Sequence, residues 1–308
     1  MINEYYQNVG IKGYFERYGI WNGLKRGLFN ANPIHFIKDY EIKKILWQKS
    51  AQKYIQKYIK NRDKDPKGLI YECDSVPENP VWVFWNSGIS NAPDIVKMCC
   101  ESIKKNSGGT VIILDENNID DYVIFPDYIK EKVKNGNIPM AGYTDLMRFA
   151  LLEHYGGMWI DSTVYLSEQL SSVIWKSKFF ALRNTMMLIE NPVLYPAWFL
   201  RAKAGNITIR EIRNVAFAYW TQEKHVVEYL LPNLIMTSII QETKVDKEIP
   251  YLSTDYSEYL LKCLGEQYDE EKLKWIFDLT PIHKLTYKLD ERIKKSESIY
   301  LKLIRKNG

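Results

Sequence analysis

The sequence contains no run of eighteen or more uncharged apolar residues, so no membrane-spanning helix is predicted. Its first residues, MINEYYQNVGIKG, lack the charged and then apolar segments of a secretory signal. Cysteine is also scarce: there are four, and their spacing suits neither a metal site nor a disulfide framework. We therefore expect reduced thiols and a cytoplasmic protein.

The motifs of several enzyme classes are missing as well. There is no Walker sequence, no Cys-x-x-Cys pair and no Ser/His/Asp order of a hydrolase, and the turn at Gly108-Gly109 is too sparse for a phosphate loop. The 46% apolar and 14% aromatic content nevertheless indicates a folded globular protein. A length of 308 residues allows one large domain or two ordinary ones.

The net charge of +4 is unevenly distributed along the chain. Residues 1–68 hold 14 Lys and Arg against 6 Asp and Glu, residues 281–308 hold 8 against 3, and the segment between them holds 20 against 29. Two basic ends that flank an acidic body favour contact with an anionic surface, either a membrane or a nucleic acid. Lysine-rich helices that are merely exposed to solvent are the equally weighted alternative.

Residues 1–68 are expected to form a basic helical extension. Within it, KGYFERYGIWNGLKRGLF (12–29) places aromatic and leucine side chains near one helical face and basic side chains elsewhere. Such a helix suits the interface of a bilayer, although packing on the body of the protein is the alternative. A second lysine-rich helix is predicted at 39–62, and a last helix at 287–304 within a basic C-terminal segment, 287–308.

Between these ends the sequence pattern alternates between strands and helices. VWVFW (81–85) and TVIIL (110–114) indicate two buried strands around a helix, and this order predicts a parallel pair. MWI (158–160) is the third predicted strand. Because Asp115 and Asp161 directly follow strands, both are expected at the carboxyl edge of the sheet, where open α/β sheets bind ligands. Helices are expected at 93–106, 126–135, 141–155, 193–204, 208–222, 225–242, 255–264 and 269–277.

The stretch YTDLMRFALLEHYGGMWIDST (143–163) carries the strongest signal for chemistry. Asp145 and Arg148 stand three residues apart and therefore share one face of the predicted helix. Two glycines alone connect this helix to the strand that ends at Asp161. We expect the three charged residues to meet in one cleft; the alternative is an ordinary surface Asp–Arg pair, which contributes little by itself.

The segments TDLMR, LLEHYGG and WIDSTVYL resemble the sugar transferases with a DXD motif, glycosyltransferase family 32 in the broad sense. The resemblance is greatest to the capsular polysaccharide synthesis branch, in which a hydroxyl residue stands in place of the second acid. It covers about residues 80–170, with a weaker likeness at PIHKLTYK (281–288).

This resemblance implies an α/β fold of the GT-A type, Rossmann-like with a mostly parallel sheet, over residues 69–286. It also implies a nucleotide-sugar donor, with a UDP-sugar expected. By the same resemblance Asp145 contacts hydroxyls of the donor sugar and Arg148 supports it. Trp85, or alternatively Phe84, stacks on the base, and Asp161 touches the ribose or a metal ion. Asp115 is counted among the donor-binding candidates from its position after a strand.

The family resemblance further implies a divalent cation, Mn²⁺ or Mg²⁺. Asp161 and Thr163 occupy the DXD positions, and the hydroxyl of Thr163 removes one charge from the oxygen ligands that such cations prefer. Thr163→Asp is therefore expected to tighten Mn²⁺ binding. His283 is a candidate for the missing ligand, with packing of a lone histidine as the alternative. Lys284 or Lys288 would neutralise charge on the leaving diphosphate.

The leading hypothesis is a retaining hexosyltransferase that acts on a polyprenyl-linked oligosaccharide at the cytoplasmic leaflet of the cell membrane, in capsular or surface polysaccharide synthesis, and that binds no nucleic acid. Arg183 and Asn184 are candidates for the acceptor side or for an ordinary loop. A non-enzymatic helical scaffold on a membrane or nucleic acid is the second hypothesis, and it predicts that Asp161 is only a satisfied core acid. A nucleotidyltransferase is the third, although no glycine- and arginine-rich phosphate loop is visible.

Overall fold

The computed structural model describes residues 4–31, 40–184, 191–290, 293 and 297–307. Its centre is a five-stranded sheet with the strand order β3-β2-β5-β8-β7. The strands are β2 (Pro80–Phe84), β3 (Thr110–Leu114), β5 (Gly157–Ile160), β7 (Phe179–Ala181) and β8 (Phe199–Ala202). The predicted parallel pairing of β2 with β3 is confirmed, and β5 also runs parallel to β2. Strand β8 runs antiparallel to both β5 and β7, so the sheet is mixed.

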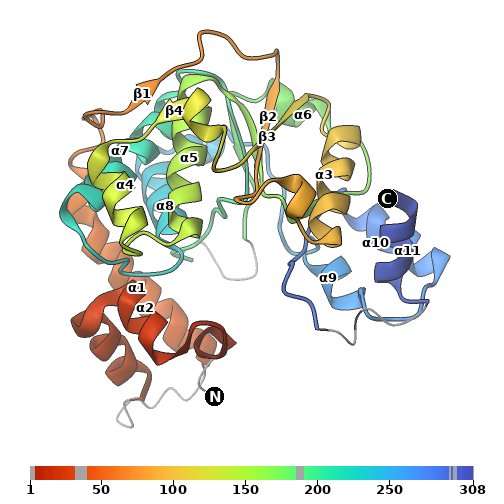
Figure 1. Ribbon diagram of the computed structural model, residues 1–308, viewed down its shortest axis with the longest axis horizontal. Coiled ribbons are helices and arrows are strands. Elements are labelled where there is room, and N and C mark those ends of the chain that lie inside the picture. Colours follow the sequence, from red (N-terminus) through yellow and green to blue (C-terminus); the bar gives the residue numbers. More distant parts are fainter. Residues whose placement is uncertain (1–3, 32–39, 185–190, 291–292, 294–296, 308) are drawn as a thin grey trace.

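Helices cover both faces of this sheet. Because both faces are buried, the sequences of the central strands are continuous apolar runs. Figure 1 shows α3 (Asp94–Asn106) on one side, and α4 (Asp127–Lys134), α5 (Met140–His154), α7 (Ile207–Gln222) and α8 (Leu231–Thr243) on the other. Helix α5 is buried without interruption from Leu146 to Glu153, because it lies between the sheet and α7. The α/β class expected from the sequence is confirmed.

Two glycines make the short connection from α5 to β5 possible. Gly156 has φ +70° and Gly157 has φ +90°, a region that side chains with a Cβ rarely adopt. A Cβ at Gly157 would lie 2.1 Å from the carbonyl oxygen of Pro80. The turn therefore ends the helix and allows β5 to pack directly beside β2.

Two small antiparallel sheets complete the body. One pairs β1 (Ile70–Tyr71) with β4 (Val123–Ile124). The other pairs β6 (Val164–Leu166), just after the strand-end acid, with β9 (Ile282–Lys284) from far along the chain. The remaining elements are α6 (Ser172–Lys176), α9 (Tyr259–Cys263), α10 (Glu270–Leu279), α11 (Ile299–Asn307) and three 3₁₀ turns, η1 (Ile89–Asn91), η2 (Ile119–Asp121) and η3 (Val245–Lys247).

The N-terminal helices α1 (Glu4–Ala31) and α2 (Tyr40–Ile59) extend from one end of the body, and the C-terminal helices lie at the opposite end (Figure 1). Both predicted N-terminal helices are confirmed. Helix α2 packs on α7 and α8, α1 packs on α2, and Arg26 of α1 pairs with Glu228 at 2.6 Å. Among the described residues, no helix is both long and apolar enough to cross a membrane.

Three predicted helices need correction. The segment 193–204 contains strand β8, since FLRA pairs with β5 and proline at 196 disfavours a helix before it. The predicted helix 225–242 begins only at Leu231, where Pro232 fits the first turn. Of 287–304, the described residues before 298 form no α-helix, and α11 starts at Ile299 after Glu297, whose φ of 64° interrupts a helix.

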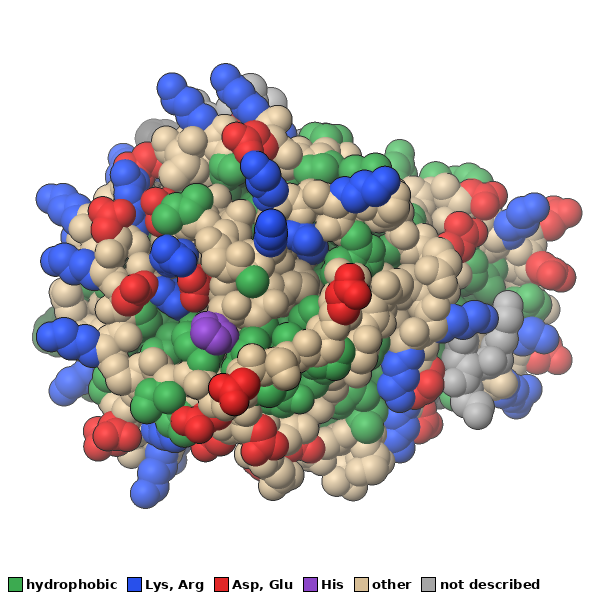
Figure 2. Space-filling view, turned by 90° about the horizontal axis from the view of Figure 1, so that it is seen from above, with side chains coloured by type: hydrophobic (Ala, Val, Ile, Leu, Met, Phe, Trp, Pro, Cys, Tyr) green, Lys and Arg blue, Asp and Glu red, His purple; other side chains and the backbone are tan. Residues whose placement is uncertain are grey.

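Basic and acidic side chains are interspersed on the face opposite the N-terminal helices (Figure 2). Figure 2 shows the molecule from above Figure 1, so it looks onto the end of the body that carries β1 and β4. Mixed charges of this kind are typical of a solvated surface. This face therefore does not favour the nucleic-acid scaffold among the hypotheses.

Candidate functional site

A cavity of about 770 Å³ opens at the carboxyl ends of β2 and β5. This is the edge at which the sequence predicts a ligand site. The cavity is lined by residues within the segments 84–87, 139–149, 159–163, 197–198, 216–235 and 284–288. Its position brings α5, the strand ends, the start of α8 and the late strand β9 around one space.

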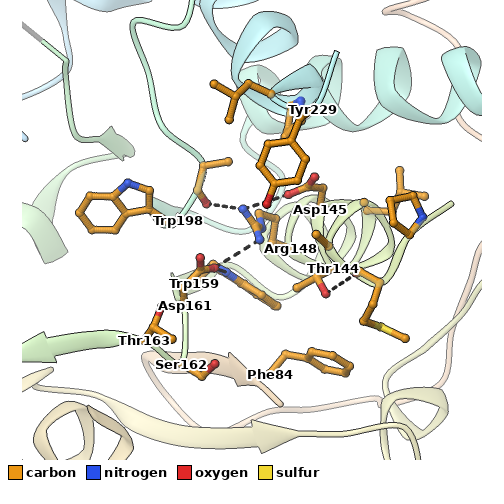
Figure 3. A pocket seen from close by; sticks show the side chains of 18 of the residues that line it. Phe84, Thr144, Asp145, Arg148, Trp159, Asp161, Ser162, Thr163, Trp198 and Tyr229 are labelled. Carbon is orange, nitrogen blue, oxygen red and sulfur yellow. Dashed lines mark hydrogen bonds and ion pairs between the residues drawn. The ribbon is translucent and has the colours of Figure 1, made fainter. Parts of the chain in front are cut away.

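Arg148 lies between two carboxylates in the wall of this cavity (Figure 3). Its Nη1 is 3.1 Å from Asp145 Oδ1, and its Nη2 is 3.3 Å from Asp161 Oδ1. Nη1 also donates to the carbonyl of Ala197 at 2.8 Å. A guanidinium that is only 7% exposed requires such partners, because an unpaired buried charge is costly. The predicted meeting of Asp145, Arg148 and Asp161 in one cleft is confirmed.

Asp161 accepts hydrogen bonds on both carboxylate oxygens. Trp159 Nε1 donates to Oδ1 at 2.9 Å, beside the Arg148 contact, and Lys284 Nζ donates to Oδ2 at 2.9 Å. Burial alone would raise the pKa of Asp161, but Lys284 and Arg148, helped by the indole N–H, bring it below its ordinary value. Asp161 is therefore held ionised on the cavity wall, with its side chain 25% exposed.

Asp145 has the opposite electrostatic behaviour. Burial raises its pKa to about 7, Arg148 opposes this rise, and the negative charge of Asp161 adds to it. Two neighbouring carboxyls therefore differ in protonation near neutral pH, an arrangement common in active sites. Figure 3 shows the ring of Tyr229 pointing toward this pair of Asp145 and Arg148.

Lys284 enters the site from the last strand of the body. In the β6–β9 register it lies opposite Val164, and Leu285 N donates to the Thr163 carbonyl at 2.8 Å. Its ammonium donates to Thr163 Oγ1 at 2.8 Å and to Asp161 Oδ2 at 2.9 Å. The lysine thus bridges the two positions that form the DXD motif in the resembling transferases.

Three other predicted donor-binding residues, Phe84, Trp85 and Lys288, also line the cavity. The Trp85 and Tyr287 rings meet edge-on with centroids 5.2 Å apart, so the two aromatic side chains form one rim. Asp115 is not a lining residue. It follows β3, which is separated from β5 by β2, and its carboxylate accepts from the backbone N–H of Asn117 at 2.8 Å.

His283 does not face the cavity either, and this placement contradicts its expected role as a metal ligand. Neighbouring residues of a strand point to opposite sides, so His283 faces away from the side on which Lys284 lies. Its ring is fully buried against Tyr165 and Phe277, and Nε2 lies 3.0 Å from Ser167 Oγ. Burial lowers its pKa to about 3. The packing alternative is therefore correct.

The acceptor-side candidates Arg183 and Asn184 are likewise outside the set of lining residues. Arg183 donates to the hydroxyl of Tyr195 at 2.7 Å, and Asn184 donates to the carbonyl of Val193 at 2.7 Å. Both contacts hold a loop together, which agrees with the ordinary loop alternative.

The residues around Asp161 do not fit a resident Mn²⁺ or Mg²⁺. Within the described ranges there is no group of three or more His, Cys, Asp and Glu side chains that could hold a metal ion. The Asp161 and Thr163 side-chain oxygens already accept hydrogen bonds from cationic or neutral donors. Even a Mg²⁺ ion that is held mainly by substrate phosphates and water uses one or two free protein carboxylates, and an adjacent ammonium group repels it.

Sequence reasoning missed three aromatic residues of the site. Trp159 could have been found, because strand alternation places it on the same face as Asp161 two residues later. Trp198, whose ring lies 5.7 Å from Lys284 Nζ, was placed in a predicted helix. Tyr229 was also assigned to a predicted helix but lies in the loop before α8. Neither carried a local signal.

Comparison with known protein families identifies the family of this chain. The family model described as "Capsular polysaccharide synthesis protein" matches residues 29–303. The chain belongs to this capsular polysaccharide synthesis protein family. The match includes both the helix motif with Asp145 and Arg148 and the late strand with Lys284, and it confirms the resemblance to the capsular polysaccharide synthesis branch.

Curated relatives match over shorter segments. O-glycosyltransferase braB of Annulohypoxylon truncatum is 30% identical over 105 residues, which cover 31% of this family member and 25% of that protein. Probable glycosyltransferase FCK3 of Fusarium pseudograminearum (strain CS3096) is 25% identical over 162 residues, or 48% and 41% of the two chains. The match thus spans less than half of either relative.

Solved structures resemble the capsular family member more loosely. PaToxG Glycosyltransferase has a TM-score of 0.38 at 14% identity, covering 87% of this chain and 98% of the other. The glycosyltransferase GlyE in Streptococcus pneumoniae TIGR4, in its apo form, has a TM-score of 0.37 at 11% identity, covering 75% and 63%.

Proposed function

We propose that this protein is a glycosyltransferase of capsular polysaccharide synthesis that moves a hexose from a nucleotide-sugar, with a UDP-sugar as the expected donor, to a lipid-linked oligosaccharide. The observation that carries the proposal is the single guanidinium of Arg148 between Asp145 and Asp161 in a strand-end cavity. Family membership supports it, as do two relatives that are named as glycosyltransferases.

The cavity offers each part of a nucleotide-sugar a chemically suitable wall. Its volume of about 770 Å³ is within the range of small-molecule sites. Phe84 and Trp85 present aromatic surface for a base, and Lys284 and Lys288 present ammonium groups for a diphosphate. Asp145, which lines the cavity from α5, is available to accept hydrogen bonds from sugar hydroxyls once it is ionised.

We further propose a retaining transfer. The bond between the anomeric carbon and the diphosphate oxygen breaks, and its electron pair remains on that oxygen. The acceptor hydroxyl adds to the same face of the sugar, and its proton goes to the departing diphosphate. The protein's contribution is mainly electrostatic: Lys284 and Lys288 stabilise negative charge that develops on the leaving oxygen, in a partly dehydrated cavity.

The N-terminal helices supply a surface for a membrane-bound acceptor. Ile20, Trp21, Leu24 and Leu28 of α1 are all exposed, and Trp21 is 77% exposed. Exposed lysines accompany them, as in helices that lie at an anionic bilayer interface. On the body side, the Arg17 guanidinium of α1 lies 5.6 Å from the ring centroid of Tyr229, which lines the cavity. Membrane contact would thus bring the cavity rim close to a lipid-linked acceptor.

A donor-hydrolysis screen tests the proposed function. Wild-type protein is incubated with UDP- and GDP-sugars, and release of nucleoside diphosphate is measured alongside thermal shift. We expect hydrolysis of at least one donor and its loss in Asp145→Asn and Asp161→Asn. Retaining chemistry is checked by NMR of the first-formed anomer. Absence of both a thermal shift and hydrolysis for all donors, with and without metal ions, would contradict the proposal.

A further inference from the structure

Lys284 occupies the space between the two DXD positions. Its Nζ lies 2.9 Å from Asp161 Oδ2 and 2.8 Å from Thr163 Oγ1. The backbone holds the residue in place, because Lys284 N donates to the carbonyl of Ser257 at 2.7 Å and the next residue, Leu285, bonds to Thr163. The side chain is 21% exposed, so its ammonium group still faces the cavity.

The charges of Lys284 and the three ionisable side chains near it balance without a further cation. Asp145 and Asp161 can supply two negative charges, and Arg148 and Lys284 supply two positive charges. Thr163 contributes an oxygen to Lys284 but no charge. An acid at position 163 would leave this group one negative charge in excess, whereas a hydroxyl matches a monovalent ammonium partner.

We propose that Lys284 takes the place of the divalent cation, so that this enzyme transfers its sugar without a metal ion. The inference rests on the proposed function for its reaction, while the position of Lys284 is independent of it. During the transfer the Lys284 ammonium keeps its protons and donates hydrogen bonds to the diphosphate oxygens. The proton of the acceptor hydroxyl, not a proton of Lys284, ends on the leaving phosphate.

This inference changes the expectation for Thr163→Asp. With Lys284 present, its ammonium group occupies the space beside position 163 and repels a divalent cation, even though the new carboxylate adds a negative charge. Mn²⁺ binding should therefore appear only when the lysine is removed at the same time, in the double variant Thr163→Asp with Lys284→Ala.

The first arm of the test measures turnover after metal removal. Wild-type protein is treated with excess EDTA, and donor hydrolysis is compared with and without added Mn²⁺. We expect rates that agree within about twofold, and a loss of about 100-fold or more in Lys284→Met, the scale seen when one electrostatic donor is removed from an active site. Lys274→Met, an exposed lysine on α10, is the matched control and should keep wild-type activity. Loss of activity in EDTA with recovery in Mn²⁺ would overturn the inference.

The second arm measures metal binding directly and does not depend on turnover. Mn²⁺ is titrated by calorimetry and by EPR into wild type and the double variant, each with and without UDP. We expect saturable binding only in the double variant; saturable micromolar binding to wild type would overturn the inference. If no donor is turned over under any condition, the proposed function fails, and this titration still decides whether Lys284 holds the cation position. A thermal melt of each variant verifies that it is folded.

Discussion

Lys284 and Thr163 are joined by a hydrogen bond of 2.8 Å although 121 residues separate them in the chain. The contact exists because β9 pairs antiparallel with β6 immediately after the strand-end acid. It places a cation from the end of the body beside the motif from its middle. The chemistry of the cavity therefore depends on a long-range pairing as much as on the motif itself.

Replacing Arg148 by lysine should inactivate the protein while preserving its charge. A lysine ammonium cannot reproduce the planar fork that reaches Asp145, Asp161 and the Ala197 carbonyl together. We expect donor hydrolysis to fall about 100-fold and the free energy of unfolding to decrease by about 3 kcal/mol. This decrease is at the lower end of the cost of breaking a buried ion pair, about 3–5 kcal/mol. Chemical denaturation and steady-state kinetics measure both. Near-wild-type values would mean that the bridge is dispensable.

Activity should rise with pH through the titration of Asp145. Its pKa of about 7 means that the ionised form, the one that accepts hydrogen bonds from a sugar, increases about tenfold between pH 6 and 8. We expect kcat/KM to follow that curve in wild type and to be low and flat in Asp145→Asn. A flat wild-type profile would remove Asp145 from the reaction.

The same group should lower stability as pH rises. The pKa of Asp145 is higher in the folded protein than its ordinary value of 3.8, so the folded state holds this proton more tightly. Its contribution to stability is fully present below about pH 4 and is lost as pH rises toward 7. The difference in melting temperature between wild type and Asp145→Asn, measured from pH 4 to 8, should therefore change mostly within this window.

Trp159→Phe isolates a single hydrogen bond of the site. Phenylalanine retains an aromatic ring near Arg148, whose guanidinium carbon lies 5.1 Å from the indole centroid, but cannot donate to Asp161. Removal of a donor to a charged group costs about 1.5–3 kcal/mol. We expect kcat to fall about tenfold or more and the apparent pKa of Asp161 to rise. An unchanged kcat would assign Trp159 to packing alone.

Substitution of the exposed apolar residues on α1 should release the protein from vesicles without affecting its cavity. Trp21→Ser with Leu24→Ser removes two such side chains, at 77% and 44% exposure. We expect binding to vesicles rich in phosphatidylglycerol to fall sharply, while hydrolysis of a soluble donor stays unchanged. Thr208→Ser, a conservative change at a buried site on α7, serves as the control for expression and folding. Vesicle binding that survives the double substitution would contradict the membrane proposal.

Gly157→Ala should destabilise the fold strongly. The new Cβ would sit 2.1 Å from the Pro80 carbonyl oxygen, in a backbone conformation of φ +90°. Relief requires β5 to move away from β2, so we expect a loss of about 3 kcal/mol or more, as for other severe core substitutions. Thermal melting measures this loss. Gly136→Ala, in an exposed turn with open space around its Cβ position, separates steric overlap from backbone strain alone.

Much of this arrangement could be predicted because its signals are local. The helix motif with Asp145 and Arg148, the two-glycine turn and the strand before Asp161 lie within one short stretch, so their convergence follows from ordinary helix and strand periodicity. The parallel pairing of β2, β3 and β5 follows from strand–helix–strand order in the same way.

The parts that could not be predicted depend on pairing between distant segments. His283 and Lys284 are neighbours in the sequence, and the register of β9 against β6 decides which of them faces the cavity. A shift of one residue would exchange the two sides, and no local pattern specifies that register. Strand β8 was mistaken for a helix for a related reason, since its strand conformation comes from pairing with β5 and β7.

The late position of β9 also has a consequence for how the protein matures. Lys284 is synthesised 123 residues after Asp161, with which it pairs. During translation, the chain that has emerged up to α8 carries the two carboxylates and Trp85, but neither Tyr287, which completes the aromatic rim, nor Lys284. A nascent chain without β9 therefore lacks the ammonium group on which the proposed transfer depends, and the site is complete only after β9 has paired with β6.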